Sequence, residues 1–316
     1  MMRRIRQLLP ILFIILMLTL AAQSIRRELQ EYSLQDVWQS VTVIPKSRLL
    51  SAFTLTGLGY LSITAYDLLG FRYIRQSLSP LKIGFTAFLS YAIGNTVGFT
   101  LLSGTAIRYR FYSPWGVSPV NIAKVIAFTH LSFWLGMFCI GGFVFLAEPQ
   151  SIPQLLNLPL HSTLPVGIAF LSIVGLYLLL SLWVRKPLRI RGEEFILPSV
   201  PLSIGLIAVT IVDWTMASGV LYSLLPGLSL SYLKFFGLYV LAMVAGVVST
   251  VPGGLGVFET VILLLRPDST PASEVLGALL AFRCIYFFLP LLVAIGLMLI
   301  FEIRRHRSSS QKPKQQ

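Results

Sequence analysis

The chain has 316 residues, of which 55% are hydrophobic and only 12% are charged, and its mean hydropathy is +0.80. The charged share is about half of that in soluble globular proteins, which excludes a soluble enzyme or a soluble binding domain. The formal net charge of +13 comes without a basic soluble domain, so we expect no nucleic-acid partner and favour loops that lie on anionic lipid.

Several apolar stretches reach the roughly 20 residues that a helix needs to span a bilayer. The sequence therefore predicts an all-α polytopic membrane protein, in which residues 1–302 form a single integral membrane domain. About eight hydrophobic segments can be distinguished, at residues 8–22, 49–69, 83–102, 121–147, 165–184, 202–225, 235–265 and 275–302. The polar and basic residues 303–316 predict a disordered cytoplasmic tail.

The N-terminal segment has the pattern of a signal sequence. Residues 3–6 form the basic run RRIR, an apolar core extends to Leu20, and two alanines follow. An uncleaved first helix is favoured over a cleaved signal in residues 1–22, because the rest of the chain is itself an integral membrane domain. Residues 23–48 are either an amphipathic helix at the interface or a solvated loop.

The charges of the loops discriminate between two topologies. With eight simple crossings, Lys and Arg are evenly divided between the two sides, whereas an excess is expected on the cytoplasmic side. That excess appears when segments 83–102 and 235–265 are re-entrant hairpins, each of which enters and leaves the membrane on one side. The first hairpin would enter from the cytoplasm and the second from outside, as in an inverted repeat with a site at its midplane. Both termini would then be cytoplasmic.

Turn residues mark both predicted hairpins. In the first, Asn95 lies between Gly94 and Gly98, among several serines and threonines, and is expected to mark the turn. The second contains STVPGGLGVFE, whose helix-breaking residues are Pro252, Gly253, Gly254 and Gly256. Broken backbone at membrane depth is tolerated only where protein covers it or where it lines a water-filled cavity. This run therefore predicts a polar cavity.

Three ionisable residues lie near the ends of apolar segments. Asp67 is either an interfacial anion paired with a nearby arginine, Arg72 or Arg75, or a head-group contact at the mouth of a cavity. Arg108 and Arg110 are flanked by aromatic residues and either anchor a cytoplasmic loop or bind a lipid phosphate. Guanidinium suits the second role because it matches phosphate geometry in a bidentate way.

Three further ionisable residues lie inside apolar segments. A carboxylate at the centre of a membrane costs about 2.5–3.5 kcal/mol, so Asp213 and Glu259 are expected to face the interior of the helix bundle. Arg283 is the matching cation, either in a structural ion pair with one of them or along a substrate route. Glu259 also fits a third role, as a carboxylate in the first turn of a half-helix that starts near Gly256.

No motif of a soluble enzyme is present in the sequence. The three histidines and two cysteines lack the spacing of metal ligands, so neither a metal site nor a cofactor is expected. Nucleotide-binding and nucleophile motifs are absent as well, and no catalytic residue can be nominated.

Two long stretches are distinctive when taken together: YAIGNTVGFTLLSGTAIRYRFYSPWGVS at residues 91–118 and VSTVPGGLGVFE at residues 248–259. They resemble the hallmark motifs of the lysylphosphatidylglycerol synthase/flippase integral membrane family. YDLLGFRY at 66–73 and FWLG at 133–136 are similar to that family too, and the resemblance covers roughly residues 5–302. In full-length members, a membrane region moves aminoacylated phosphatidylglycerol between leaflets and a cytosolic domain makes that lipid.

The resemblance implies a phospholipid flippase-like protein of the bacterial inner membrane, which binds or translocates an aminoacylated phosphatidylglycerol-type lipid. It covers only the membrane part, so transport rather than synthase activity is expected. By resemblance, Asp67, Arg108, Arg110 and Glu259 occupy motif positions around the polar cavity of the family. The alternatives are a membrane-embedded lipid-modifying transferase and a scaffold for a separately encoded synthase. The expected partners are membrane phospholipids, together with such a synthase or a second copy of the chain.

Overall fold

The computed structural model describes residues 39, 42, 44–97, 100–148, 162–184, 188–190, 193–225, 230–248, 254, 256–267 and 270–310. Segment 1–22, most of 23–48, the positions Gly98, Pro252 and Gly253, and residues 311–316 of the tail lie outside the described residues. Within the described ranges the chain is helical, apart from one pair of short strands.

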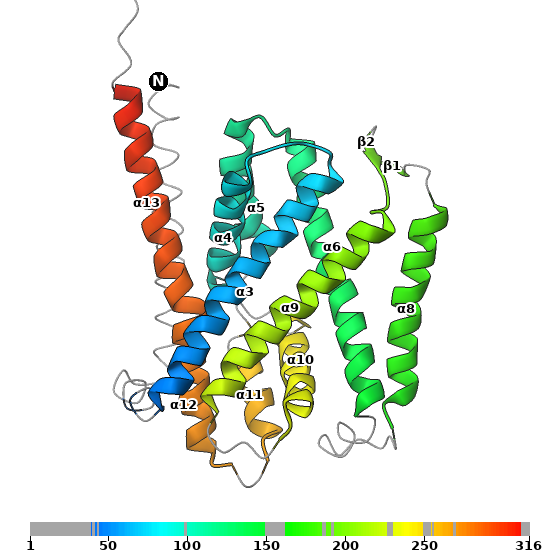
Figure 1. Cartoon of the computed structure of the whole chain (residues 1–316), viewed down its shortest axis with the longest axis vertical. Helices are drawn as coiled ribbons and strands as arrows, with labels where there is room; N and C mark the ends of the chain where they lie inside the picture. The colour runs from blue at the N-terminus through cyan, green and yellow to red at the C-terminus, as the bar shows by residue number, and fades with distance from the viewer. Residues whose placement is uncertain are drawn as a thin grey trace, which may run out of the picture.

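The first elements are α3 (Lys46–Tyr73), α4 (Pro80–Val97), α5 (Thr100–Tyr112), the 3-10 helix η1 (Ser113–Trp115) and α6 (Pro119–Ala147). The next are α8 (Leu164–Trp183), the strands β1 (Leu188–Ile190) and β2 (Glu193–Phe195), α9 (Val200–Leu224), α10 (Tyr232–Val248) and α11 (Val257–Leu264). The chain then forms α12 (Ala272–Phe282), the π-helix η3 (Arg283–Phe288) and α13 (Leu289–Ser310). Figure 1 shows α3 and α9 side by side across the middle, with α13 at one edge and α8 at the other.

Five helices in the described part of the chain are long and apolar enough to cross a membrane. They are Lys46–Tyr73, Pro119–Ala147, Leu164–Trp183, Val200–Leu224 and the continuous helix Glu274–Arg304. Each coincides with a segment that hydropathy predicts as a simple crossing. The prediction of an α-helical, multi-pass membrane protein is therefore confirmed. Helix α13 continues to Ser310 and so includes the first part of the basic tail.

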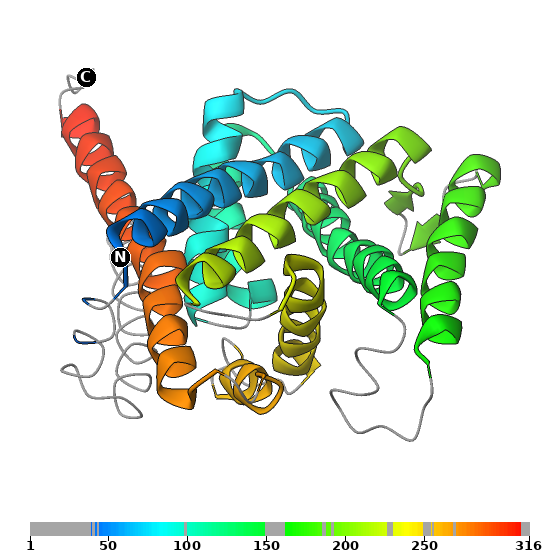
Figure 2. The same cartoon turned by 60° about the horizontal axis from the view of Figure 1, so that its bottom comes forward.

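Helices α4 and α5 form an antiparallel pair whose two ends lie together. Gln76, which precedes α4, donates a hydrogen bond from Nε2 to the carbonyl oxygen of Gly116, which follows η1, at 3.2 Å. Asn121 donates from Nδ2 to Oε1 of Gln76 at 3.1 Å. The chain therefore enters and leaves the α4–α5 pair at the same end of the molecule, which Figure 2 shows from a second direction.

The break between these two helices falls later than Asn95, where the sequence predicts the turn. Helix α4 runs through Gly94 and Asn95 and ends at Val97. Gly94 is buried, and the side chain of Asn95 reaches the hydroxyl group of Tyr60 on α3. Both residues thus lie inside a helix, and neither ends it.

Helices α10 and α11 form a second antiparallel pair. The rings of Tyr239 and Phe258 lie 5.5 Å apart between centroids. Nearer the break, a Cβ atom added to Gly246 would lie 3.4 Å from the Cα atom of Gly254. Gly254 and Gly256 have φ angles of +65° and +76°, so glycine allows the backbone to turn tightly into α11.

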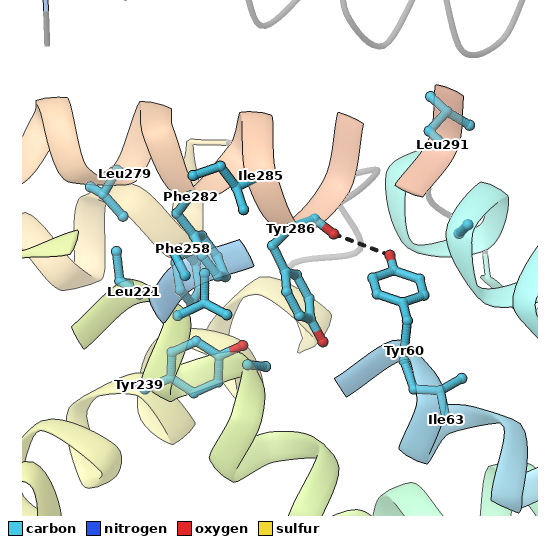
Figure 3. Packing of buried hydrophobic residues seen from close by; sticks show 14 of the residues in the cluster. Tyr60, Ile63, Leu221, Tyr239, Phe258, Leu279, Phe282, Ile285, Tyr286 and Leu291 are labelled. Carbon is cyan, nitrogen blue, oxygen red and sulfur yellow. Dashed lines mark hydrogen bonds between the residues drawn. The ribbon is translucent and has the colours of Figure 1, made fainter. Parts of the chain in front are cut away.

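In the π-helix η3, backbone carbonyl groups of the last membrane segment accept hydrogen bonds from neighbouring helices. A π-helix shifts the backbone hydrogen bonds and leaves carbonyl groups for other partners. Tyr60 on α3 donates its hydroxyl group to the carbonyl oxygen of Tyr286 at 3.1 Å, as Figure 3 shows. Thr96 on α4 donates to the carbonyl oxygen of Phe287 at 3.3 Å. These bonds dock η3 onto the first two helices.

Strands β1 and β2 form an antiparallel hairpin between α8 and α9, a feature that the basic run at residues 185–191 does not indicate. Arg189 lies opposite Glu194 in this pairing. Tyr73, the last residue of α3, donates its hydroxyl group to the carbonyl oxygen of Ile196 at 2.7 Å. The hairpin is thereby held at that end of α3.

We expect Gly136→Ala to destabilise the protein, because a Cβ atom at this position of α6 would overlap the side chain of Thr210 on α9. Overpacking of this kind costs about 1–3 kcal/mol. The melting temperature in detergent should fall. Gly175→Ala on α8 is the matched control, since its Cβ atom would meet nothing within 4 Å. Equal melting temperatures for the two variants would contradict the packing described here.

Candidate functional site

A buried ion pair joins α3 to α5. Arg108 donates from Nε to Oδ2 of Asp67 at 2.9 Å and from Nη2 to Oδ1 at 2.7 Å, which is a bidentate geometry. Tyr112 donates its hydroxyl group to the same Oδ2 at 2.7 Å, and the guanidinium lies 5.0 Å from the centre of the Tyr91 ring. Asp67 is fully buried, and Arg108 is 3% exposed. A phosphate could use this guanidinium only by replacing the carboxylate.

The local sequence explains how the pair forms. Arg108 and Tyr112 are four residues apart on α5 and therefore lie on one face of the helix, which faces Asp67. Gly104 precedes Arg108 by one turn, and a Cβ atom there would lie 3.2 Å from Nη1 of the guanidinium. Asp67 is thus buried rather than interfacial, and its partner is distant in sequence, not one of the arginines that follow it.

A second buried ion pair joins α11 to η3. Arg283 donates from Nε to Oε1 of Glu259 at 2.7 Å, and both residues are almost completely buried. The guanidinium lies 4.8 Å from the centre of the Phe287 ring and 6.0 Å from that of Phe258. Oε2 of Glu259 is buried and has no hydrogen-bond partner in the described part of the chain. Glu259 also lies in the first turn of α11, so it can offset the positive end of the helix dipole as well.

Asp213 lies near the middle of α9 and pairs with no Lys, Arg or His among the described residues. Its Oδ2 atom accepts a hydrogen bond from the hydroxyl group of Tyr66 at 3.1 Å. Its Oδ1 atom is buried without a partner in the same set of residues. Of the two pairings that the sequence leaves open for Arg283, the structure has the one with Glu259.

One tyrosine hydroxyl group donates a hydrogen bond to the carboxylate of Asp213, and other tyrosines lie within electrostatic range of it. The tyrosines within its electrostatic range are Tyr60, Tyr66, Tyr91, Tyr239 and Tyr286. Tyr91 also interacts with Arg108, and Tyr239 lies within range of Arg283. Figure 3 shows Tyr239 and Tyr286 beside each other in the core. Tyr91 and Tyr239 thus each lie near Asp213 and near one of the two ion pairs.

The sequence patterns do not single out these tyrosines, although two of them, Tyr66 and Tyr91, lie in the motifs that carry the family resemblance. Nor do they single out Glu302 on α13, which accepts a hydrogen bond from Nη2 of Arg110 at 2.9 Å. Arg110 thus joins α5 to the last membrane segment, whereas Arg108 faces α3. The signal that could identify the tyrosines is their position beside the charged motif residues.

This arrangement can bind ionic groups inside a membrane protein. Each guanidinium is held by a carboxylate, so an anionic ligand binds there by exchange for that carboxylate. The carboxylates offer sites for a cation, and two of their oxygen atoms lack a partner among the described residues. In that part of the chain, no group of His, Cys, Asp and Glu side chains could hold a metal ion.

Similar proteins are found across the full membrane region. The chain is 45% identical over 308 residues to the uncharacterized protein slr0712 of Synechocystis sp., a match that covers 96% of this chain and 95% of the relative. It is 30% identical over 270 residues to the inner membrane protein YbhN of Escherichia coli, covering 85% of this chain and 84% of that protein. No family model matches the chain.

The similarity extends to a group of larger proteins. The chain is 24% identical over 296 residues to the phosphatidylglycerol lysyltransferase of Staphylococcus aureus, a match that covers 92% of this chain. The same match covers only 34% of the lysyltransferase. The chain is therefore homologous to the membrane part of that protein.

Removing one partner of the Asp67–Arg108 pair leaves an uncompensated buried charge, which costs about 3–5 kcal/mol. We therefore expect Asp67→Ala to lower the melting temperature in detergent strongly. Adding Arg108→Met to that variant removes the orphaned charge and should restore part of the loss. The control is Glu148→Gln, because the Glu148–Lys234 pair is partly exposed, with a separation of 3.8 Å. An Asp67→Ala protein as stable as the control would show that the ion pair contributes nothing.

Proposed function

We propose that this chain, which belongs to the membrane-protein family of slr0712 and YbhN, is a phospholipid flippase-like protein of a bacterial inner membrane. It binds an aminoacylated phosphatidylglycerol-type lipid and moves its head group between the leaflets. Two comparisons support this: YbhN is named an inner membrane protein, and the staphylococcal relatives are named phosphatidylglycerol lysyltransferases. The chain spans about a third of the length of those transferases, so only their membrane part bears on the proposal.

The observation that carries the proposal is the polar set inside the bundle of membrane helices. Ionisable groups at membrane depth are costly and are retained mainly where they serve a substrate or ion pathway. Here the Asp67–Arg108 pair, the Glu259–Arg283 pair and Asp213 lie within electrostatic range of shared tyrosines, and Asp213 has no cationic partner among the described residues. Arg108 suits the phosphate of a lipid, and the carboxylates suit an ammonium group. Acyl chains can remain in the bilayer while the head group crosses.

Two helix pairs support a site at the midplane. Helix α4 has 18 residues, α5 has 13, α10 has 17 and α11 has 8. Each is shorter than the roughly 20 residues of a full crossing, and both pairs are antiparallel. We propose that they are re-entrant hairpins that enter from opposite sides in an inverted repeat, with both chain termini cytoplasmic. Their broken ends and the charged residues beside them would then form the route for the head group.

A leaflet-resolved assay in reconstituted vesicles tests the flippase proposal. Lysylphosphatidylglycerol should cross faster than in protein-free vesicles. Glu259→Gln should abolish the acceleration, because a neutral amide can neither hold Arg283 as a counter-ion nor accept an ammonium group. Glu274→Gln replaces an exposed carboxylate on α12 and should leave the rate unchanged.

The outcome against this proposal is the absence of acceleration for every anionic or aminoacylated phospholipid supplied. Chemical change of the lipid during the assay would instead favour the membrane-embedded transferase. Unchanged transport by the Glu259→Gln protein would remove Glu259 from the route.

Cysteine labelling tests the first re-entrant hairpin. In a background with Cys139 and Cys284 replaced by alanine, we expect Ser79→Cys and Ser118→Cys to react with a membrane-impermeant thiol reagent from the same side. These positions precede α4 and α6, at the end where the α4–α5 pair begins and ends. Pro271→Cys, before α12, should react from the opposite side. Labelling of the first two positions from opposite sides would show that the pair crosses the membrane.

A further inference from the structure

Asp213 is half-buried, with a buried Oδ1 atom, and it differs from the buried carboxylates of the described helices because no cation neutralises it. Asp67, Glu259 and Glu302 each pair with an arginine. Asp213 has no such partner in the described part of the chain. The Asp67–Arg108 pair and the Glu259–Arg283 pair are each neutral as a whole. Asp213 therefore adds one acidic group whose charge no described cation offsets.

The ionisable groups near Asp213 in the described part of the chain are tyrosine hydroxyl groups. Those within its electrostatic range are Tyr60 and Tyr66 from α3, Tyr91 from α4, Tyr239 from α10 and Tyr286 from η3. Helices α6, α8 and α12 also pack against α9, and no ionisable group of theirs acts on this carboxyl among the described residues. One hydrogen bond reaches it, from the hydroxyl group of Tyr66 to Oδ2, and Oδ1 receives none. These hydroxyl groups are polar enough to hold a small cation, and no cationic side chain of the described residues pairs with Asp213 itself.

The depth of Asp213 limits the states that it can adopt. It lies in the middle of α9, at roughly 16–20 Å from either end when each residue adds about 1.5 Å to the helix. A carboxylate that deep in a membrane protein is stable only when it is protonated or when a cation lies beside it. A proton and a cationic ligand therefore compete for one position.

We propose that Asp213 exchanges a proton for the ammonium group of an amine-bearing phospholipid head group. In the empty protein the carboxyl group keeps its proton. As the ammonium group enters, the O–H bond of the carboxylic acid breaks and the proton leaves to water. The carboxylate and the ammonium then form a neutral pair. When the head group departs on the other side, the carboxylate takes up a proton from water there, so lipid and proton move in opposite directions.

This inference rests on the proposed function and sharpens it, because it names an amine as the group that the site selects. Proton release on lipid binding tests it. The whole chain, purified in weakly buffered detergent with a pH-sensitive dye, is mixed with lysylphosphatidylglycerol or with phosphatidylglycerol. We expect about one proton per bound lysyl lipid and none with phosphatidylglycerol. Asp213→Asn should abolish the release, and Tyr66→Phe, which keeps the carboxyl group, should retain it.

The outcomes of this experiment distinguish failure of the proton exchange from failure of the proposed function. Binding of the lysyl lipid without proton release, or equal release from the Asp213→Asn protein, overturns the exchange and leaves the proposed function intact. Failure of the lysyl lipid to bind at all overturns both. If the asparagine variant is folded but does not bind the lysyl lipid, proton release by the Asp213→Glu protein is measured instead. That variant keeps a carboxyl group, so the exchange predicts that it still releases a proton when the lipid binds. A melting temperature close to that of the wild type confirms that each variant is folded.

Discussion

Charge buried among membrane helices sets the arrangement of this protein. The bidentate contact between Arg108 and Asp67 accepts one orientation of the guanidinium, so it fixes the rotation of α5 against α3. Tyr112 binds the same carboxylate and adds a second fixed point on α5. Any rotation of α5 would leave a buried charge without its partner, and the free-energy cost of that is larger than the contribution of most single interactions. Glu259 and Arg283 fix α11 against the last membrane segment by the same rule.

Irregular backbone is placed where other parts of the protein cover it. Carbonyl groups released from regular helix need partners in an apolar medium, and η3 finds them in Tyr60 and Thr96 from α3 and α4. The π-helix begins at Arg283, so the residue that meets Glu259 lies at the start of the altered backbone. The glycine turn before α11 brings Glu259 to the same place from the other side. Two irregular segments thus bring one ion pair together.

Hydropathy predicts the membrane helices because length and apolar content alone decide whether a segment can cross. The cost of a charge at membrane depth likewise singles out Asp213, Glu259 and Arg283 from the sequence alone. Pairing is different: Asp67 and Arg108 are 41 residues apart, and which arginine reaches the carboxylate depends on tertiary packing. The tyrosines give no such signal, because tyrosine costs little in membrane segments and is common at their interfaces. Strands β1 and β2 are three residues each, too short for an alternating pattern to appear.

Under the proposed function, the two kinds of acid among these helices imply an order of recognition for a lipid head group. A phosphate reaches Arg108 only after displacing Asp67, and the displaced carboxylate then needs a new partner. Under the exchange proposed above, an ammonium group reaches Asp213 without breaking any ion pair of the described chain, because it displaces only a proton from that carboxyl group. Under the proposed function, the free energy gained at Asp213 can therefore offset the exchange at Arg108. On that proposal, the amine selects the lipid, and the phosphate follows it into the site.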